Sequence, residues 1–155
     1  MPDSGAASRF VDPGADSPGF VLWQVTLAWQ RGVAEALRPL DLTHVQFVLL
    51  ACTWWLGRSA TLPSQLDVGR QAGTDPKMTS EVLRRLEAKE LLVRTVDPAD
   101  TRVRRVEVTA AGAELAQRAV RVVEAADAEF FGAHGPAVLD SLRPLGTRRG
   151  APGGS

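Results

Sequence analysis

The chain has 155 residues, of which 45% are hydrophobic and 23% charged, a composition typical of one soluble globular domain. Its 18 basic and 18 acidic residues cancel, which excludes a strongly basic protein but not a locally basic surface. A single cysteine excludes an internal disulfide. The absence of an apolar run of roughly 18 residues excludes a membrane span, so we expect a cytoplasmic protein.

The two ends of the chain are predicted to lie outside the fold. Residues 1–18 are rich in Gly, Pro, Asp and Ser, and we expect them to be disordered. They lack the basic start and the apolar stretch of a signal peptide. Residues 146–155 are predicted to form a flexible tail, which leaves a folded domain over 19–145.

The first two predicted helices are strongly apolar. The first spans 20–37 and ends before Pro39, with apolar residues on more than one face. Such a helix needs several neighbours, and in a small protein one of them is often a second chain. The second helix runs over 43–57 and begins with a capping box of Thr43 and Gln46. Because it is apolar nearly all round, we expect it to be the buried central helix.

A helix–turn–helix comes next. Its first helix covers 64–71 and its second covers 75–89, each starting at a polar residue that can cap it. Gly69 allows the two helices to cross closely, and Gly73 allows a left-handed turn between them. The inner stripe of the second helix is predicted to consist of Thr79, Val82, Leu83 and Leu86.

Two strands over 91–96 and 102–108 are predicted to form a hairpin, with Asp97-Pro98-Ala99-Asp100 between them. Asp100 is expected to support the loop by pairing with Arg102 or with a backbone N–H. The C-terminal part is helical again, with a long helix from Thr109 to about residue 132. A short helix over 137–142 is expected to end before Pro144.

Helix, turn, helix and hairpin in this order indicate a winged helix-turn-helix, a mainly α fold with a small β-hairpin wing. In such a unit the second helix enters a DNA major groove and the wing lies beside it. Arg102 sits on a slim loop, and a guanidinium suits the narrow, negative minor groove. The order of elements therefore predicts a DNA-binding lobe.

Several fragments resemble the MarR family of winged-helix transcription factors. They are Leu91-Leu92-Val93-Arg94, Asp97-Pro98-Ala99-Asp100-Thr101-Arg102, Val108-Thr109-Ala110-Ala111-Gly112 and Leu42-Thr43-His44-Val45-Gln46-Phe47. The resemblance implies a homodimer held by helices over 20–38 and 110–145, with a DNA-binding lobe over 42–109. It also implies a near-palindromic operator and relief of repression by a small ligand or an oxidant.

The candidate DNA contacts lie on the outer face of the second helix and on the wing. They are Lys77, Met78, Ser80, Glu81, Arg84, Arg85, Arg94, Arg102, Arg104 and Arg105. The alternative is that the helical residues form an ordinary solvated face, or that Met78 fills the core. Arg104 and Arg105 point to opposite faces of their strand, so at most one is expected to reach a phosphate well.

Two residues depart from the family pattern. Glu81 stands where many relatives carry arginine or another polar donor; a glutamate is repelled by phosphates but can accept a hydrogen bond from cytosine N4. Glu90 replaces the usual glycine before Leu91, so we expect the turn into the wing to be made differently.

A pocket for a small aromatic effector and a redox switch are further candidates. Cys52 has apolar sequence neighbours, which favour an inert buried thiol over a sensor. Aromatic walls with a few polar groups suit a planar ligand, although core and dimer packing explain the same residues at least as well. The pocket candidates are Trp23, Trp29, His44, Phe47, Trp54, Trp55 and Arg58.

The chain contains no glycine-rich phosphate loop and no His, Cys and carboxylate cluster at metal-ligand spacing, so we predict neither enzyme activity nor a metal or cofactor. The predicted function is a homodimeric, ligand-responsive transcriptional repressor. The alternative is a dimeric small-molecule or protein-binding module of the same fold with weak or lost DNA binding. Zero net charge and Glu81 are the reasons for keeping that alternative.

Overall fold

The computed structural model describes residues 8–146, and its elements follow the predicted order. Those described residues are mainly helical, with one two-stranded antiparallel hairpin, which confirms the predicted fold class. The elements are α1 (Pro13–Asp16), α2 (Pro18–Leu37), η1 (Arg38–Leu40), α3 (His44–Leu56), α4 (Gln65–Ala72), α5 (Pro76–Ala88), β1 (Leu92–Val96), β2 (Arg104–Val108), α6 (Ala110–Phe131), η2 (Gly132–His134) and α7 (Gly135–Gly146).

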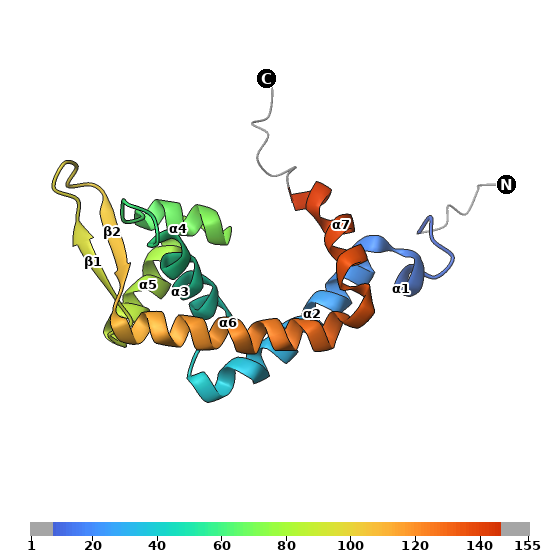
Figure 1. Cartoon of the computed structure of the whole chain (residues 1–155). Coiled ribbons are helices and arrows are strands. Elements are labelled where there is room, and N and C mark those ends of the chain that lie inside the picture. Colours follow the sequence, from blue (N-terminus) through green and yellow to red (C-terminus); the bar gives the residue numbers. More distant parts are fainter. Residues whose placement is uncertain (1–7, 147–155) are drawn as a thin grey trace, which may run out of the picture.

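The long helix α6 forms the base of the molecule (Figure 1). At one end it carries the winged lobe, which consists of α3, α4, α5, β1 and β2. At the other end it leads through η2 into α7, and α6 also packs against α2. The two ends rise from the same side of α6, so the chain is U-shaped. No helix among the described residues has the length and apolar character needed to cross a membrane.

The core lies where α2, α3, α5, α6 and the wing meet. Leu37, Leu49, Leu50, Leu83 and Leu92 are fully buried there. Burying each leucine side chain contributes about 1.5–3 kcal/mol relative to leaving it exposed. As predicted, α3 is the central helix, because it packs against α2, α4, α5, α6 and β2.

Local capping sets the helix boundaries. Thr43 and Gln46 form the predicted capping box at the start of α3. The Asp75 carboxylate accepts the Met78 N–H at 2.9 Å at the start of α5. Thr109 Oγ1 accepts the Gly112 N–H at 3.0 Å at the start of α6. Each cap satisfies a backbone donor that the first helical turn leaves unpaired.

The wing is tied to the lobe at its base. In addition to the β1–β2 pairing, the Val106 N–H donates to the Pro63 carbonyl at 3.0 Å, and Ser64 forms an isolated antiparallel β-bridge with Arg105. The sequence pattern did not predict that β2 pairs with residues 63 and 64. It joins β2 to the residues that lead into α4, so the wing and the helix–turn–helix form one continuous unit.

Gly112 lies directly against the other end of the wing. A Cβ atom at this position would be 1.7 Å from the Leu91 carbonyl oxygen, so only glycine fits. The Thr109 N–H also donates to that Leu91 carbonyl at 3.1 Å. The motif that ends in Gly112 therefore allows α6 to start in contact with the strand entering the wing.

The expectation that Glu90 changes the turn into the wing, because it replaces the family's glycine, is wrong. Its φ is +59°, the left-handed conformation that glycine adopts without strain. The Thr109 hydroxyl donates to the Glu90 carbonyl at 2.8 Å and helps to hold it there. The turn is kept, and the glutamate carries the backbone strain.

Two expectations about the chain ends also need correction. Residues 13–16 form helix α1 and α2 begins at Pro18, in place of the expected disorder, because the Asp12 carboxylate accepts the Gly14 N–H at 2.9 Å and Ser17 caps α2. The last helix continues through Pro144 to Gly146. A proline in a final turn removes only one helical hydrogen bond, so this extension is tolerated. Within the ends that were predicted to be disordered or flexible, residues 1–7 and 147–155 lie outside the described residues.

Candidate nucleic-acid interface

Helix α5 has one buried face and one free face. Thr79, Val82, Leu83 and Leu86 are buried, as the sequence predicted. At about 100° per residue, Lys77, Glu81 and Arg84 point within roughly 40° of the opposite direction. Met78 is 45% exposed, so it does not fill the core. Ser80 lies at the border of the free face and is half-buried.

The start of α5 is fixed against α4 at a close crossing. A Cβ on Gly69 would lie 2.7 Å from Thr79 Oγ1, so the small residue is required there. Thr79 Oγ1 donates to the Asp75 carbonyl at 2.8 Å and also bonds Thr74 Oγ1 at 2.7 Å. Gly73 makes the intervening turn with φ +73°. These contacts hold the free face of α5 in one orientation.

Arg102 stands at the end of the wing with its guanidinium held by Asp100. Nε and Nη2 donate to the two carboxylate oxygens at 3.0 Å each, and the Arg102 N–H donates to Oδ1 at 3.1 Å. Both ways in which Asp100 was expected to support the loop are therefore present. The Arg102 side chain remains 88% exposed, and its hydrogen bonds lower the pKa of Asp100.

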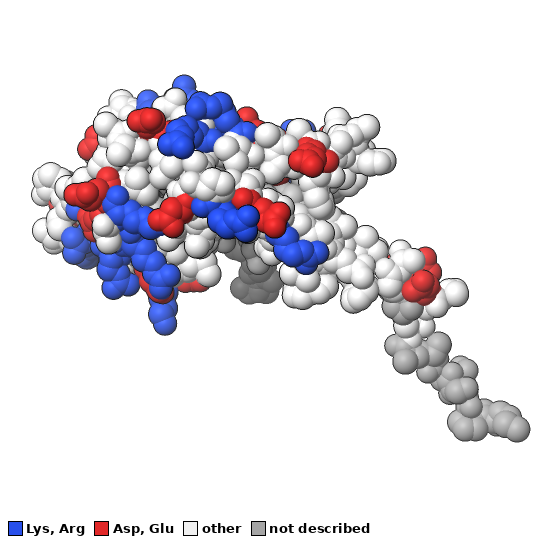
Figure 2. All heavy atoms as spheres, turned by 90° about the horizontal axis from the view of Figure 1, so that it is seen from below, with Lys and Arg blue, Asp and Glu red and all other residues white. Residues whose placement is uncertain are grey.

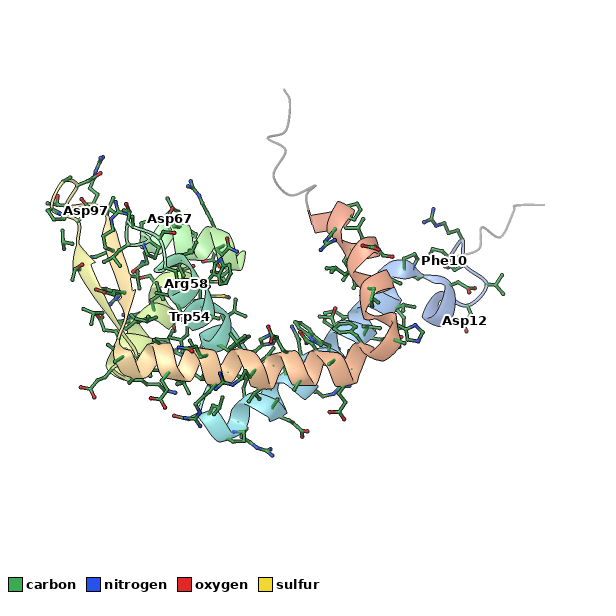
Figure 3. The ribbon with its side chains drawn as sticks, in the orientation of Figure 1. Phe10, Asp12, Trp54, Arg58, Asp67 and Asp97 are labelled. Atoms are coloured by element: carbon green, nitrogen blue, oxygen red, sulfur yellow. The ribbon has the colours of Figure 1, made fainter. Side chains whose placement is uncertain are left out.

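Asp97 braces the wing tip, a role that the sequence pattern did not indicate. Its carboxylate accepts the N–H groups of Ala99 and Asp100 at 2.8 and 3.0 Å, and Arg105 Nε at 2.6 Å. Arg105, in turn, donates to the Leu62 carbonyl at 3.1 Å. These donors hold the pKa of Asp97 below its usual range. Figure 3 shows Asp97 where the wing projects away from α6.

The two hairpin arginines consequently have different roles. Arg105 is 29% exposed and occupied by Asp97 and Leu62, whereas Arg104 is exposed. The expectation that only one of them reaches a phosphate well thus points to Arg104. Figure 2 shows basic side chains gathered at the end of the molecule that carries the winged lobe.

Arg94 was expected to contact DNA, but its side chain is turned to other residues of the lobe. Its guanidinium donates to Glu87 at 2.9 and 3.0 Å and to Gln65 at 3.3 Å, and its side chain is 18% exposed. The Arg94 N–H also donates to Glu87 and contributes most to the lowered pKa of that carboxyl. Arg94 therefore links α4, α5 and β1, and its donors are not directed at a phosphate.

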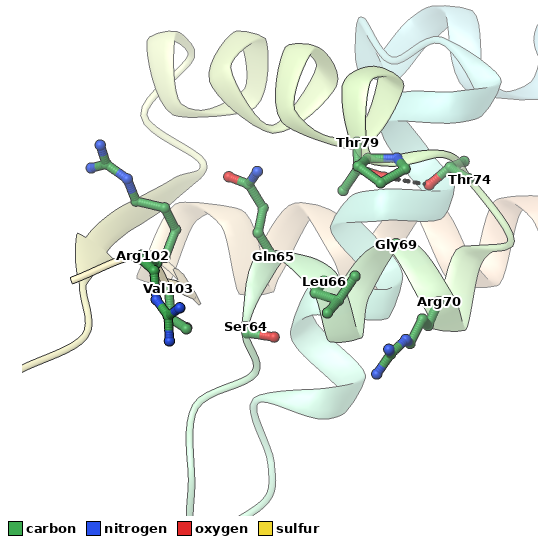
Figure 4. A pocket seen from close by; sticks show the side chains of 11 residues that line it. Ser64, Gln65, Leu66, Gly69, Arg70, Thr74, Thr79, Arg102 and Val103 are labelled. Carbon is green, nitrogen blue, oxygen red and sulfur yellow. Dashed lines mark hydrogen bonds between the residues drawn. The ribbon is translucent and has the colours of Figure 1, made fainter. Parts of the chain in front are cut away.

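A cavity of about 380 Å³ lies between α4, the start of α5 and the wing. Figure 4 shows Arg102 and Arg70 on opposite sides of it, with Gln65 between them. Arg70 is exposed and was not among the predicted contacts. The sequence shows only that Arg70 is a basic residue in the last turn of α4. Its position across the cavity from the wing follows from the packing of α4 against the lobe.

The seven residues predicted for an effector pocket do not lie together in the structure. One group packs between helices, and a second group lies near the end of α3. Trp29 packs edge-on against His44 at 5.0 Å and donates Nε1–H to Asp127 at 2.7 Å, which joins α2, α3 and α6. Burial lowers the pKa of His44, and Asp127 opposes this shift. Phe47 packs against the core, and Trp23 is 60% exposed on α2.

The second group lies around the end of α3. The Arg58 guanidinium carbon is 4.8 Å from the ring centroid of Trp55 and 5.8 Å from that of Trp54. Trp55 is 59% exposed, and Figure 3 shows Trp54 and Arg58 in the lobe above α6. This group combines aromatic surface with a positive charge.

The remaining candidates for chemistry are limited. Cys52 is half-buried and its burial raises the pKa of the thiol, which agrees with an inert cysteine. Within residues 8–146, no three His, Cys, Asp or Glu side chains are grouped so that they could hold a metal ion.

Comparisons with known proteins agree with this geometry. The model of the MarR family matches residues 42–103. An uncharacterized HTH-type transcriptional regulator, YdcH of Bacillus subtilis, is 42% identical over 127 residues, covering 81% of this chain and 85% of its own. The HTH-type transcriptional repressor Rv2887 of Mycobacterium tuberculosis is 37% identical over 117 residues, covering 75% and 81%.

A similar solved structure is that of CouR from Rhodococcus jostii RHA1, bound to p-coumaroyl-CoA. It has a TM-score of 0.74 and 27% identity, over 90% of this chain and 96% of that one. The similarity therefore extends beyond the winged lobe to the helices at both ends.

Proposed function

We propose, since the chain belongs to the MarR family of HTH-type transcriptional regulators, that it is a homodimeric, ligand-responsive repressor acting in the cytoplasm. Members of this family are DNA-binding proteins rather than enzymes. The observation that carries the proposal is the exposed Arg102 guanidinium, held in place by Asp100 on the cavity that the start of α5 also lines.

The proposed contacts follow from exposure. Lys77 and Arg84 on α5 and Arg104 on the wing are exposed and form no ion pair within the described residues, so they are the candidates for phosphates. Arg102 is proposed to enter the minor groove next to the major groove occupied by α5. Arg70, on the other side of the cavity, is added as a phosphate contact.

A second copy of the chain is the proposed partner. Large apolar side chains are exposed at the end of the U away from the winged lobe, on α2, α6 and α7, and a group of exposed apolar side chains favours association. Two-fold symmetry then places the two α5 helices in successive major grooves, about 10 base pairs or 34 Å apart. The exposed residues are Phe20, Leu22, Trp23, Val25, Phe130, Leu139, Leu142 and Leu145.

The proposed effector is a planar aromatic molecule that carries a negative charge. The Trp54, Trp55 and Arg58 group offers ring faces and one cation for such a molecule. CouR, which was solved with p-coumaroyl-CoA, supports this ligand class. We expect p-coumaroyl-CoA or a related aromatic acid to quench tryptophan fluorescence in the wild type and much less in Arg58→Ala.

Binding to DNA is tested by fluorescence anisotropy with a duplex covering the region upstream of the gene, at two salt concentrations. Saturable binding that weakens with salt supports the repressor proposal, because phosphate contacts release counterions. Ligand binding without affinity for any duplex, even at low salt, would instead identify a binding module that has lost its DNA function.

A further inference from the structure

Glu81 occupies the centre of the free face of α5. Its neighbours along that face are Lys77, one turn before, and Arg84 and Arg85, one turn after. Lys77, Glu81 and Arg84 lie opposite the buried stripe, and Arg85 lies at the edge of that face, so a major groove that receives α5 also receives Glu81. A negative charge at the centre of a DNA-facing helix requires an explanation, since phosphates repel it.

The structure places a cation directly on that charge. Arg85 Nη2 donates to Glu81 Oε1 at 2.6 Å, and the two side chains are 65% and 46% exposed. The pair is one helical turn apart, so it forms without distorting α5. Arg85 offsets the charge of the carboxylate. Within the described residues, the second oxygen, Oε2, accepts no hydrogen bond and is free for a partner outside the chain.

We infer that Glu81 is a base-reading residue and that it selects cytosine in each half of the operator. The inference rests on the proposed DNA-binding function and adds the identity of a base pair to it. Oε2 accepts a hydrogen bond from the N4 amino group of cytosine, and Arg85 keeps the carboxylate extended and its charge offset. Arg85 acts as the positioning residue in this arrangement.

The major-groove edges of the bases explain the selectivity. Cytosine presents an amino donor, whereas thymine presents the O4 acceptor and guanine presents two acceptors, N7 and O6. A carboxylate has only acceptors, so it is repelled by thymine and guanine. Adenine has an amino group, but its neighbouring N7 acceptor faces the carboxylate unfavourably. Replacing the C·G pair by T·A should weaken binding roughly five- to 150-fold, which corresponds to about 1–3 kcal/mol.

The test is in vitro selection from a pool of randomised duplexes, carried out with the full-length wild type, Glu81→Gln, Glu81→Ala and the control Glu107→Gln. Glu107 is an exposed carboxylate on β2 of the same lobe, so its substitution changes the net charge equally without altering α5.

The wild type and Glu107→Gln are expected to enrich one symmetric site with a fixed cytosine in each half. In Glu81→Gln that position should change to adenine, because an amide both donates to N7 and accepts from N6. In Glu81→Ala the position should lose its preference while the other positions keep theirs.

A consensus that is identical in the wild type and both Glu81 variants would overturn the assignment of Glu81 while leaving the proposed function intact. A wild type that enriches no sequence at all would overturn the proposed function itself. The two failures are therefore distinguished within one experiment.

Discussion

Replacing Gly112 by alanine should strongly destabilise the winged lobe. The new methyl group would lie 1.7 Å from the Leu91 carbonyl oxygen and 2.8 Å from its carbonyl carbon. Both groups belong to the backbone, so no side-chain rotation relieves the clash. The start of α6 and the strand entering the wing must instead separate by more than about 1 Å to restore normal contact.

The cost follows from what that separation breaks. The hydrogen bonds from Thr109 to the carbonyls of Leu91 and Glu90, at 3.1 and 2.8 Å, both span the gap. Their loss costs about 0.5–1.5 kcal/mol each. Overpacking adds about 1–3 kcal/mol. The expected loss of roughly 2–6 kcal/mol is a large part of the roughly 5–15 kcal/mol that stabilises a typical domain.

Urea unfolding monitored by circular dichroism, at one fixed protein concentration, measures this loss. The control is Gly32→Ala in α2, where a Cβ meets nothing within 4 Å. That variant should be stabilised by about 0.5–1 kcal/mol, because alanine favours a helix over glycine. A Gly112→Ala protein within about 1 kcal/mol of the wild type would refute the proposed reason for the glycine.

Three further predictions concern the backbone, the arginines and pH. Glu90→Gly should raise stability by about 0.5–1 kcal/mol in the same assay, because glycine adopts φ +59° without strain; a lower stability would show that Glu90 is not strained. Arg94→Ala should lower the free energy of unfolding by about 1–2 kcal/mol, since the Arg94–Glu87 pair is only partly exposed. Arg104→Ala should leave the urea midpoint unchanged and weaken DNA binding. The reverse pattern would contradict the assignment of the two arginines. Because the pKa of His44 is lowered in the folded state, the unfolded chain takes up the proton first, and stability should fall as pH drops from about 7 through the folded pKa. The stability of His44→Phe should depend less on pH between about pH 7.5 and about pH 5.5. An equally steep pH dependence in that variant would exclude His44 as its source.

Features that depend on near neighbours in the chain were predictable from the sequence. The capping box of Thr43 and Gln46 involves residues three positions apart, and the buried stripe of α5 repeats with the helical period. The support of Arg102 by Asp100 spans only two residues. In each case a local pattern has one low-energy geometry, and the folded chain adopts it.

Features that depend on the packing of separate elements were not predictable. Arg94 has the sequence character of a phosphate contact, but Glu87 and Gln65 surround it only once α4, α5 and β1 have packed together. Trp29 was a candidate for a ligand wall, yet its indole N–H is occupied by Asp127, 98 residues away. The spacing of residues along the sequence does not reveal partners that are so far apart in the chain.

Gly112 lies between these cases. The motif resemblance drew attention to it, but its physical reason, the contact with the Leu91 carbonyl, emerges only when the wing folds back onto α6. A motif can thus identify a required residue before the requirement is known.

The most direct test of the central claim is the affinity of Arg102→Ala for a duplex that the wild type binds, measured at two salt concentrations beside Arg118→Ala, an exposed arginine on α6 outside the winged lobe. We expect Arg102→Ala to bind roughly ten- to a hundredfold more weakly than the wild type, with unchanged stability and oligomeric state. Arg118→Ala should bind like the wild type. Equal affinities of Arg102→Ala and the wild type at both salt concentrations would contradict the assignment of the wing as a DNA contact.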